Sequence, residues 1–384
     1  MELYIHIPFC RRKCLYCDFL SFPAYDGQIN RYIDTLIREL RDYSGLLCDV
    51  STVFIGGGTP SILDIRQTDL LLKAVAAYSS KAVEWSIECN PGTLDREKLG
   101  LYREYGINRL SLGLQSADAD ELIRLGRIHD PGQFYKTYDM ARETGFDNIN
   151  IDIMSGLPGQ TINSWEKTLR TCAELKPEHI SAYSLIIEPG TPFYDIYGHD
   201  DQCRDHCDNN VCPLPSEEDE REMYHMTGRI LGEFGFERYE ISNYSLPGYE
   251  CRHNLGYWKG AEYLGIGIGA ASYYNGMRYK NTSDIGTYLA FSGTGHGLEE
   301  SRSDVEVIGP QEKLEEFMIL RLRLKEGISR KEFKDTFGFG IEEKFGEIID
   351  KYVENGLLIS RGDRLFLSER GTDLANTVMS DFCE

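Results

Sequence analysis

Three cysteines near the start of the chain are the residues best suited to chemistry. Cys10, Cys14 and Cys17 follow a C-x-x-x-C-x-x-C spacing. Thiolate sulfur is a soft ligand that selects copper, zinc or iron–sulfur clusters. A structural zinc ion needs four protein ligands, and the sequence offers no obvious fourth ligand nearby. The pattern therefore favours a cubane iron–sulfur cluster with one open iron over three unrelated reduced cysteines on a loop.

The residues around the cysteines strengthen this interpretation. Arg11, Arg12 and Lys13 stand between the first two cysteines, and nearby positive charge favours a thiolate over a thiol. The stretch resembles the signature of the radical S-adenosylmethionine (radical SAM) family, in which an aromatic residue precedes the third cysteine, as Tyr16 does here. The resemblance implies a [4Fe-4S] cluster on the three cysteines, with SAM bound to the fourth iron through its amino and carboxylate groups.

A wider string narrows the resemblance to one branch of that family. Tyr4-x-His6-Ile7-Pro8-Phe9-Cys10 is similar to the oxygen-independent coproporphyrinogen III oxidases and their relatives, the heme chaperone HemW proteins. Their chemistry, as the resemblance implies it, begins with reductive cleavage of SAM at the cluster, which gives a 5′-deoxyadenosyl radical that abstracts hydrogen.

Length and composition limit the classes of protein that fit. A chain of 384 residues exceeds one compact core, so we expect two or three lobes. No apolar run approaches a membrane span, and residues 3–9 already read as structure instead of a signal peptide. Eleven cysteines, an odd number without an export signal, point to reduced thiols in the cytoplasm. The net charge of −21 argues against general nucleic-acid binding.

The first half of the chain alternates between two kinds of pattern. Strand-like runs cover 3–7, 52–55, 84–88, 108–112, 148–154 and 179–185, and helical runs cover 28–43, 68–79, 96–105, 118–125, 131–144 and 163–175. Repeated β–α units predict a parallel sheet with crossover helices. Six units are two short of a closed barrel. We therefore predict an α/β fold with an incomplete (β/α)6 TIM-like barrel at residues 1–195, as the resemblance also implies. In such folds the chemistry lies at the carboxyl ends of the strands.

A glycine run follows the second strand. Gly56-Gly57-Gly58-Thr59 lets the backbone approach a ligand closely, although a lone glycine run is more often a flexible turn. It is not a phosphate loop, because the Gly-Lys-Ser/Thr ending is missing. The resemblance implies that this motif binds the methionine amino group of SAM.

Polar residues near the ends of later strands complete the candidate site. Glu88 can accept hydrogen bonds from a ribose or an ammonium, or it is a solvated acid at a strand end. Asp152 lies within an apolar strand, where an unpaired charge is costly, so an Asp152–Arg127 ion pair is an alternative to ligand binding. The resemblance implies contacts with SAM, and with a second SAM molecule at some positions. The implied cofactor-binding set is Tyr4, Tyr16, Gly57, Gly58, Thr59, Glu88, Gln115, Arg127, Asp152, Ile186 and, loosely, Ala271.

The middle of the chain, residues 196–308, is predicted to extend the barrel and to lie near heme or substrate. Cys203, Cys207 and Cys212, with His199 and His206, could hold a second metal. Their spacing matches no zinc or ferredoxin pattern, so we interpret this insert as a variable surface loop.

A histidine follows later in this region. The string His253-Asn254-x-x-Tyr257-Trp258 resembles a feature of the HemW proteins, in which that histidine is implicated in heme ligation. Neutral imidazole is a common heme ligand, and aromatic neighbours can stack on a macrocycle. The alternative is a core histidine packed beneath the mouth of the barrel.

Residues 309–384 show a third pattern. Helical runs at 311–323 and 341–355, a short helix after Gly327 and a hairpin at 356–367 resemble a winged helix, and the family carries such a C-terminal domain. The helix at 341–355 is rich in acidic residues, which would repel phosphates. A lid or docking role is therefore favoured over DNA binding.

Two departures separate the oxidases from the chaperones. The oxidases have one more cysteine, where this chain has Asp18-Phe19 after Cys17, and a long N-terminal extension, whereas this chain starts three residues before Tyr4. Together with the His253 string, these features predict a heme chaperone that binds heme and transfers it to client proteins. The alternatives are an oxidase that converts coproporphyrinogen III to protoporphyrinogen IX, and a radical SAM enzyme for another substrate. We expect a tetrapyrrole, client proteins and an electron donor as partners, but no nucleic acid. Peripheral membrane contact and a homodimer stay open.

Overall fold

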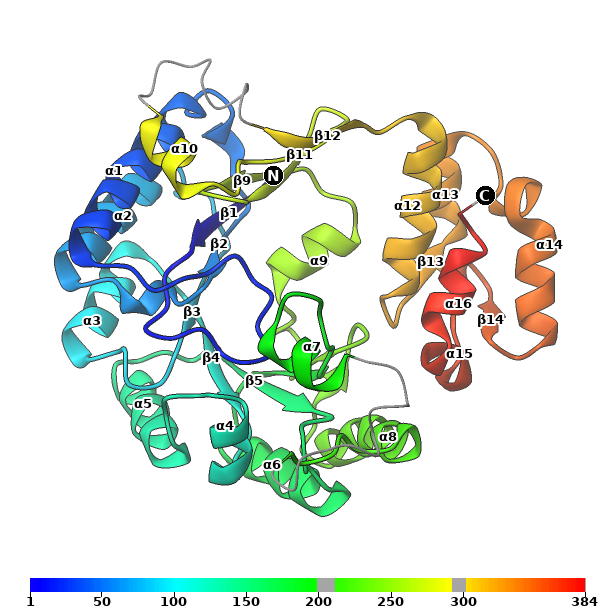
Figure 1. Cartoon of the computed structure of the whole chain (residues 1–384). Coiled ribbons are helices and arrows are strands. Elements are labelled where there is room, and N and C mark those ends of the chain that lie inside the picture. Colours follow the sequence, from blue (N-terminus) through cyan, green and yellow to red (C-terminus); the bar gives the residue numbers. More distant parts are fainter. Residues whose placement is uncertain (199–210, 292–301, 384) are drawn as a thin grey trace.

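A single mixed sheet runs through most of the molecule (Figure 1). The computed structural model describes residues 1–198, 211–291 and 302–383. Within them the sheet has the strand order β12-β11-β10-β9-β1-β2-β3-β4-β5-β6-β8-β7. Its parallel centre consists of β1 (Glu2–Ile7), β2 (Thr52–Gly57), β3 (Glu84–Cys89), β4 (Arg109–Gln115), β5 (Ile149–Ser155) and β6 (His179–Ser184).

Helices that connect these strands cover the outer face of the sheet (Figure 1). They are α1 (Asp26–Asp42), α2 (Ile65–Ala76), α3 (Arg96–Tyr105), α4 (Ala119–Arg124), α5 (Pro131–Glu143) and α6 (Ile162–Glu174). Short polar N-caps start several of them: Asp64, Asp130 and Thr161 each form a capping box, which satisfies otherwise free amides of the first turn. The predicted incomplete (β/α)6 barrel is confirmed.

Alternation along the parallel strands separates an apolar face from a polar one. Side chains such as Leu3, Ile5 and Leu110 are fully buried in the main core against the helices. Neighbouring positions, which point to the opposite face, carry polar groups such as Glu84 and Asp152. The interior of the barrel is therefore polar, which is unusual for a packed barrel core and is what a ligand site requires.

Further elements extend the sheet at both edges. After α7 (Pro192–Tyr197) and α8 (Glu217–Glu233), the short strand β8 (Asn243–Ser245) pairs with β6, and β7 (Glu237–Arg238) pairs with β8 at the edge. At the other edge, β9 (Tyr263–Ile266) pairs in parallel with β1, and β10 (Ala271–Tyr274), β11 (Met277–Lys280) and β12 (Ser303–Val307) follow in antiparallel order. The helix α10 (Ile285–Ala290) packs on α1.

The helix α9 (Arg252–Trp258) lies between the barrel and the C-terminal helices (Figure 1). It contacts both β2 and α12. Of the predicted cysteine insert, Cys203 and Cys207 lie outside the described residues, as do His199 and His206. Cys212 is described and packs near Gly159.

The C-terminal part has its own core. It contains α12 (Pro310–Leu322), β13 (Ile328–Ser329), α13 (Arg330–Phe337), α14 (Ile341–Glu354), β14 (Leu358–Arg361), β15 (Arg364–Leu367), α15 (Glu369–Asp373) and α16 (Ala375–Ser380). The three strands form a separate small sheet, and Phe317, Phe333 and Phe345 belong to a separate hydrophobic cluster. The predicted winged-helix-like α+β character is confirmed.

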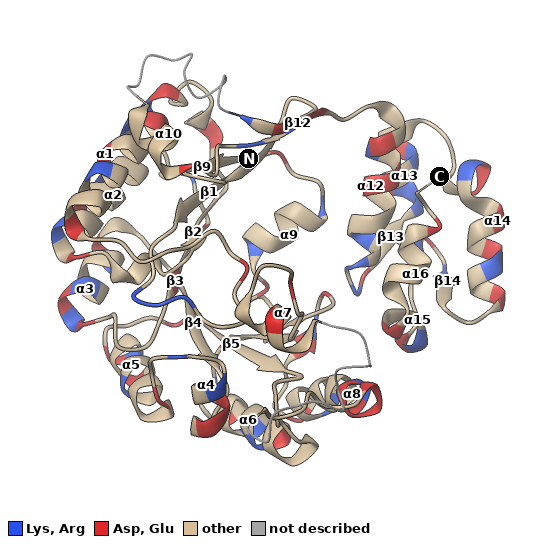
Figure 2. Cartoon of the chain, in the orientation of Figure 1, with Lys and Arg blue, Asp and Glu red and all other residues tan. Residues whose placement is uncertain are grey.

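Charge and hydropathy are distributed unevenly over these elements. Figure 2 shows acidic residues at the start of α8. Its first turn contains Glu217, Glu218, Asp219 and Glu220, whose negative charges interact favourably with the positive end of the helix dipole. No helix in the described parts of the chain has the length and apolar character needed to cross a membrane.

Candidate functional site

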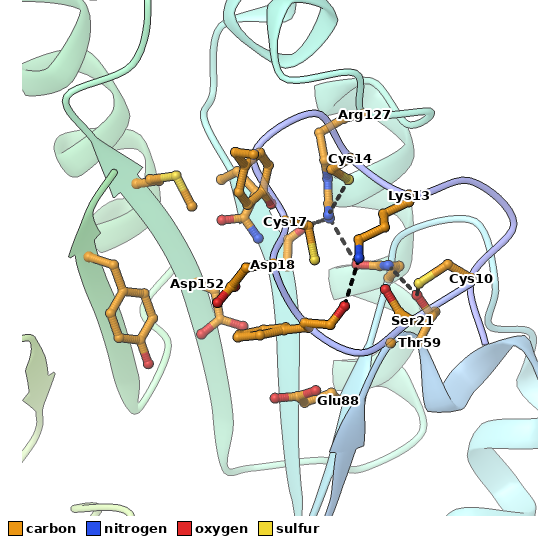
Figure 3. A pocket seen from close by; sticks show the side chains of 18 of the residues that line it. Cys10, Lys13, Cys14, Cys17, Asp18, Ser21, Thr59, Glu88, Arg127 and Asp152 are labelled. Carbon is orange, nitrogen blue, oxygen red and sulfur yellow. Dashed lines mark hydrogen bonds between the residues drawn. The ribbon is translucent and has the colours of Figure 1, made fainter. Parts of the chain in front are cut away.

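A cavity of about 450 Å³ lies at the carboxyl ends of the parallel strands (Figure 3). We call it the cysteine cavity. Its wall includes most of the predicted site residues: Cys10, Cys14, Tyr16, Cys17, Gly57, Gly58, Thr59, Glu88, Gln115, Arg127, Asp152 and Ile186. The structure therefore brings together residues that come from a loop, five strands or strand ends, and the turn after α4.

Backbone hydrogen bonds hold the cysteine loop over this cavity. At its base, the amide of Phe22 donates to Pro8 and the amide of Cys10 donates to Phe22. Further along, the amide of Leu15 donates to the carbonyl of Leu125 at the end of α4. Arg12 also donates to the carbonyl of Gly126. The loop is thus fixed on two sides, which limits how far the thiols can move.

The thiols have polar partners on the cavity wall. Cys10 Sγ lies 3.4 Å from Thr59 Oγ1, and Arg127 Nη1 donates to Cys14 Sγ at 3.6 Å. Burial raises the pKa of Cys17, while a hydrogen bond with the backbone of Phe19 and the charge of Lys13 lower it in part. The charge of Lys13 thus acts in the direction that the sequence analysis expects, toward the thiolate.

Glycine is required beside the first thiol. A Cβ at Gly58 would lie 2.8 Å from the carbonyl oxygen of Phe9 and 3.1 Å from Cys10 Sγ. At Gly57 the backbone has a φ of +115° and a Cβ would meet the ring of His6. Both positions need a residue without a side chain. The glycine run is therefore a tightly packed part of the cavity wall, and the flexible-turn alternative is wrong.

The alternative role of Arg127 and Asp152, an ion pair between them, is not what the structure shows. Arg127 Nη2 donates to Asn90 Oδ1 and to the carbonyl of Gly113, both at 2.8 Å. Asp152 instead accepts hydrogen bonds from Ser111 and Asn150. The two terminal nitrogens of the guanidinium therefore have their partners on the cysteine side of the cavity, and the carboxylate accepts from neutral donors.

Asn90 is a site residue that the sequence analysis missed. Its amide Nδ2 donates to Thr59 Oγ1 at 2.8 Å, while its Oδ1 accepts from Arg127. It thus connects the glycine run with Arg127. Its position two residues after Glu88, directly at the end of β3, was the available signal.

Glu88 is an acid in the cavity wall. Its Oε2 accepts a hydrogen bond from the amide of Gly57 at 3.0 Å. Burial, together with the nearby Asp152, raises the pKa of Glu88 to about 8, and burial also raises the pKa of Asp152. Two acids that are costly to ionise become easier to ionise when a cation enters, so this cavity favours a positively charged ligand. Glu88 is thus a hydrogen-bonded, partly exposed acid of the cavity wall.

Local backbone irregularity places Gln115. It has a φ of +71°, in the left-handed region that non-glycine residues seldom occupy, beside a register shift between β4 and β5. Such bulges redirect side chains near ligand sites. Ile186, beyond the end of β6, is 67% exposed at the cavity mouth.

A second cavity of about 820 Å³ adjoins the first. The two share Phe19, Gly57, Glu88 and Tyr183 in their walls. The larger one, which we call the aromatic cavity, is lined by the rings of Tyr4, Phe54, Tyr257, Trp258, Tyr263 and Tyr273. Tyr4 and Ala271 belong to this cavity and not to the cysteine cavity.

His253, on α9, lies in the wall of the aromatic cavity. It is 1% exposed, and its ring stacks on Phe54 with 5.2 Å between centroids. Nδ1 lies 2.7 Å from Thr52 Oγ1, and Nε2 lies 2.9 Å from the hydroxyl of Tyr257. Both ring nitrogens thus have protein partners, as the core-histidine alternative expects. Tyr257, the partner of Nε2, also lines the cavity.

Comparisons with known proteins place this geometry in a family. Residues 4–172 match the Radical SAM superfamily, and residues 308–374 match the HemN C-terminal domain. The heme chaperone HemW of Lactococcus lactis is 36% identical over 99% of this chain and 96% of its own length. The heme chaperone HemW of Bacillus subtilis is also 36% identical, over 99% and 98%.

The chain belongs to the HemW family. The relative from Escherichia coli, with 34% identity over 100% of this chain and 98% of that protein, agrees. The solved coproporphyrinogen III oxidase HemN of Escherichia coli has the same fold, with a TM-score of 0.84, 23% identity and coverage of 99% and 89% of the two chains. As a radical SAM protein of the HemW family, the chain has a [4Fe-4S] cluster and SAM as cofactors.

The residues of the cysteine cavity fit these cofactors. In the described parts of the chain no three His, Cys, Asp or Glu side chains are grouped around a single point as the ligands of one metal ion are. A cubane cluster has different iron atoms for different cysteines, so its thiols stand farther apart than the ligands of one ion. Three thiols on one loop, beside a glycine wall and two acids, therefore suit a cluster with a cationic ligand better than a lone ion.

Proposed function

We propose that this protein binds heme and transfers it to client proteins. The observation that carries the proposal is its similarity, along nearly the whole chain, to proteins named heme chaperone HemW. The aromatic cavity supports it, because its volume of about 820 Å³ lies in the range of small-molecule sites. Aromatic side chains also offer flat faces for a macrocycle.

The cysteine cavity is proposed as the site of the cluster and SAM. Cys10, Cys14 and Cys17 would hold the cluster, and the glycine run would approach the methionine part of SAM. Glu88 and Asp152 would compensate the positive charge of its sulfonium group, because the raised pKa values of their carboxyl groups favour a cationic partner. When bound, the cluster and SAM supply radical chemistry. The remaining wall residues that we propose to contact SAM are Tyr16, Gly57, Gly58, Thr59, Asn90, Gln115, Arg127 and Ile186.

The aromatic cavity is proposed as the heme site, with His253 as the ligand of the heme iron. A neutral imidazole is suited to this role. Burial between Phe54 and Tyr257 orients the ring, and a turn of the Tyr257 side chain would free Nε2. Tyr4 and Ala271 would form part of the wall.

Other expected properties are proposals of the same kind. A cluster that takes part in reduction needs an electron donor, and heme delivery in the cytoplasm needs client proteins; a homodimer is compatible with both. We also propose that residues 1–195, 196–308 and 309–384 act as barrel, extension and C-terminal domain. The separate hydrophobic cluster of the last part supports this division.

The test compares binding with turnover in protein reconstituted without oxygen. One sample receives heme alone, and its Soret band is followed. A second sample receives coproporphyrinogen III, SAM and a low-potential reductant, and its products are separated by chromatography. The proposal predicts stoichiometric heme binding and no protoporphyrinogen IX. Protoporphyrinogen IX in excess over the protein would instead identify an oxidase.

A further inference from the structure

A series of buried and partly buried hydrogen bonds leads from the cysteine cavity to the start of α9, the helix that carries His253. It begins at Asp152, in the cysteine cavity, whose Oδ1 accepts from Asn150 Nδ2 at 2.8 Å. Asn150 Oδ1 lies 2.6 Å from His179 Nδ1, and His179 Nε2 lies 2.8 Å from the hydroxyl of Tyr239. That hydroxyl in turn accepts from the amide of Cys251 at 3.3 Å. Cys251 is the N-cap residue of α9, which carries His253.

The direction of each hydrogen bond follows from the acid at its end. Asn150 turns its Nδ2 toward the carboxylate, so its Oδ1 must accept from His179, and His179 therefore carries its proton on Nδ1. Burial holds the pKa of His179 well below its ordinary value, so the ring is neutral and Nε2 accepts from Tyr239. Every donor points toward Asp152. Donors aligned in this way polarise one another, so a change at the carboxylate reaches the far end of the chain.

A second anchor holds α9 independently of Tyr239. Glu84, on β3, accepts hydrogen bonds from the amides of Arg252 and His253 at 2.9 and 3.2 Å. Its negative charge also suits the N-terminus of a helix. Loss of the Tyr239 hydroxyl should therefore leave the helix in place, because Glu84 still binds it, but it removes the hydrogen bonds that link α9 to Asp152.

We propose that His179 and Tyr239 are positioning residues that couple ligand contact at Asp152 to the position of α9. Because α9 carries His253, they thereby couple the ligand to the aromatic cavity. The inference rests on the proposed SAM and heme sites. When SAM contacts Asp152, it changes how strongly the carboxylate accepts the hydrogen bond from Asn150. This change passes along the series of hydrogen bonds and reaches α9 through the amide of Cys251. Because such coupling is reciprocal, heme bound against α9 changes SAM affinity by the same factor.

Hydrogen–deuterium exchange tests the coupling without heme. The segment 251–258 is followed in protein with reconstituted cluster, with and without SAM and in the absence of reductant, and SAM binding is verified by equilibrium dialysis. We expect SAM to change the exchange rate of this segment by about fivefold or more. Tyr239→Phe should abolish that change, and so should Asn150→Ser, which interrupts the series of hydrogen bonds at another residue. Tyr102→Phe is the matched control, because it removes a buried hydroxyl that has no partner.

The possible results separate this inference from the proposed function. An unchanged exchange rate in wild type that binds SAM, or a SAM effect that survives in both chain variants, overturns the coupling. A wild type that binds no SAM contradicts the proposed SAM site and the coupling with it. Coupled exchange in a protein that binds no heme supports the inference and overturns the heme proposal. With heme present, its affinity should depend on SAM in the wild type and Tyr102→Phe only.

Discussion

At the scale of single residues, backbone clearance decides how closely the cysteine loop approaches the strand ends. The loop passes Gly58 so closely that a Cβ there would overlap the carbonyl oxygen of Phe9 and contact Cys10 Sγ. The carbonyl oxygen belongs to the backbone and cannot turn aside as the end of a side chain can. An added methyl group must therefore displace the loop that carries the thiols.

Gly58→Ala is accordingly predicted to lower cluster content several-fold. Iron and sulfide per chain, with the visible absorption of the cluster, measure this after reconstitution. Gly45→Ala serves as the control, because a Cβ there meets nothing within 4 Å. Equal cluster content in the two variants would show that the loop position does not matter.

Another residue-scale prediction concerns pH. Glu39 on α1 accepts hydrogen bonds from the amide of Gly267, from Asn281 and from Tyr288, and burial raises its pKa to about 7. Because this value exceeds the ordinary 4.5, the folded state holds a proton that the unfolded state releases. The associated stability is present below the unfolded-state pKa and is lost as pH rises through the folded-state pKa.

The free energy of unfolding of the wild type should thus fall, relative to Glu39→Gln, by about 2–3 kcal/mol between about pH 5 and about pH 8. Urea denaturation at the two pH values measures the difference. The slope is compared and not the absolute stability, because Gln cannot accept all three hydrogen bonds. Parallel pH profiles of the two proteins would refute this role of Glu39.

At the scale of elements, the sequence predicted most helices and strands because apolar periodicity marks them directly. It could not predict which elements meet across long separations. β9 pairs with β1, and this pairing places Ala271 in the aromatic cavity. In the same way, α9 is seated on Glu84 of β3, which no local pattern around His253 reveals.

The alternative of an Asp152–Arg127 ion pair could not be decided from the sequence for a related reason. A carboxylate in an apolar strand needs a partner, and the sequence does not show which donor supplies it. Which donor reaches the carboxylate depends on side-chain direction at the strand ends. There Asn90 and the carbonyl of Gly113 occupy the guanidinium, and Asn150 on the same strand as Asp152 serves the carboxylate.

The C-terminal domain gives a prediction about element packing. Phe333 on α13 is fully buried among Phe317, Phe337 and Phe339. Phe333→Ala should destabilise this domain by about 3–5 kcal/mol, as measured by denaturant unfolding. The content of iron–sulfur cluster should stay unchanged, because the barrel has a separate hydrophobic core. Cluster loss in step with domain unfolding would show instead that the two cores depend on each other.

At the scale of the whole molecule, two adjoining cavities share one barrel mouth. The cysteine cavity fits a cluster and a cationic cofactor, and the aromatic cavity, closed on one side by α9, fits a flat macrocycle. Phe19 and Tyr183 stand where the two meet. We therefore propose that heme binds to the extension that follows the barrel, and that the cluster site lies beside the heme site.

The most direct test of this account is a heme titration that locates the site. Wild type, His253→Ala and His225→Ala are titrated with heme, and the Soret band is followed; His225 is a partly exposed histidine on α8. We predict equimolar, saturable binding by the wild type and His225→Ala. For His253→Ala we predict a shifted Soret band and binding weaker by at least about tenfold, which corresponds to about 1.4 kcal/mol, because the iron loses its protein ligand. Identical titrations for all three proteins, or no saturable binding, would contradict it.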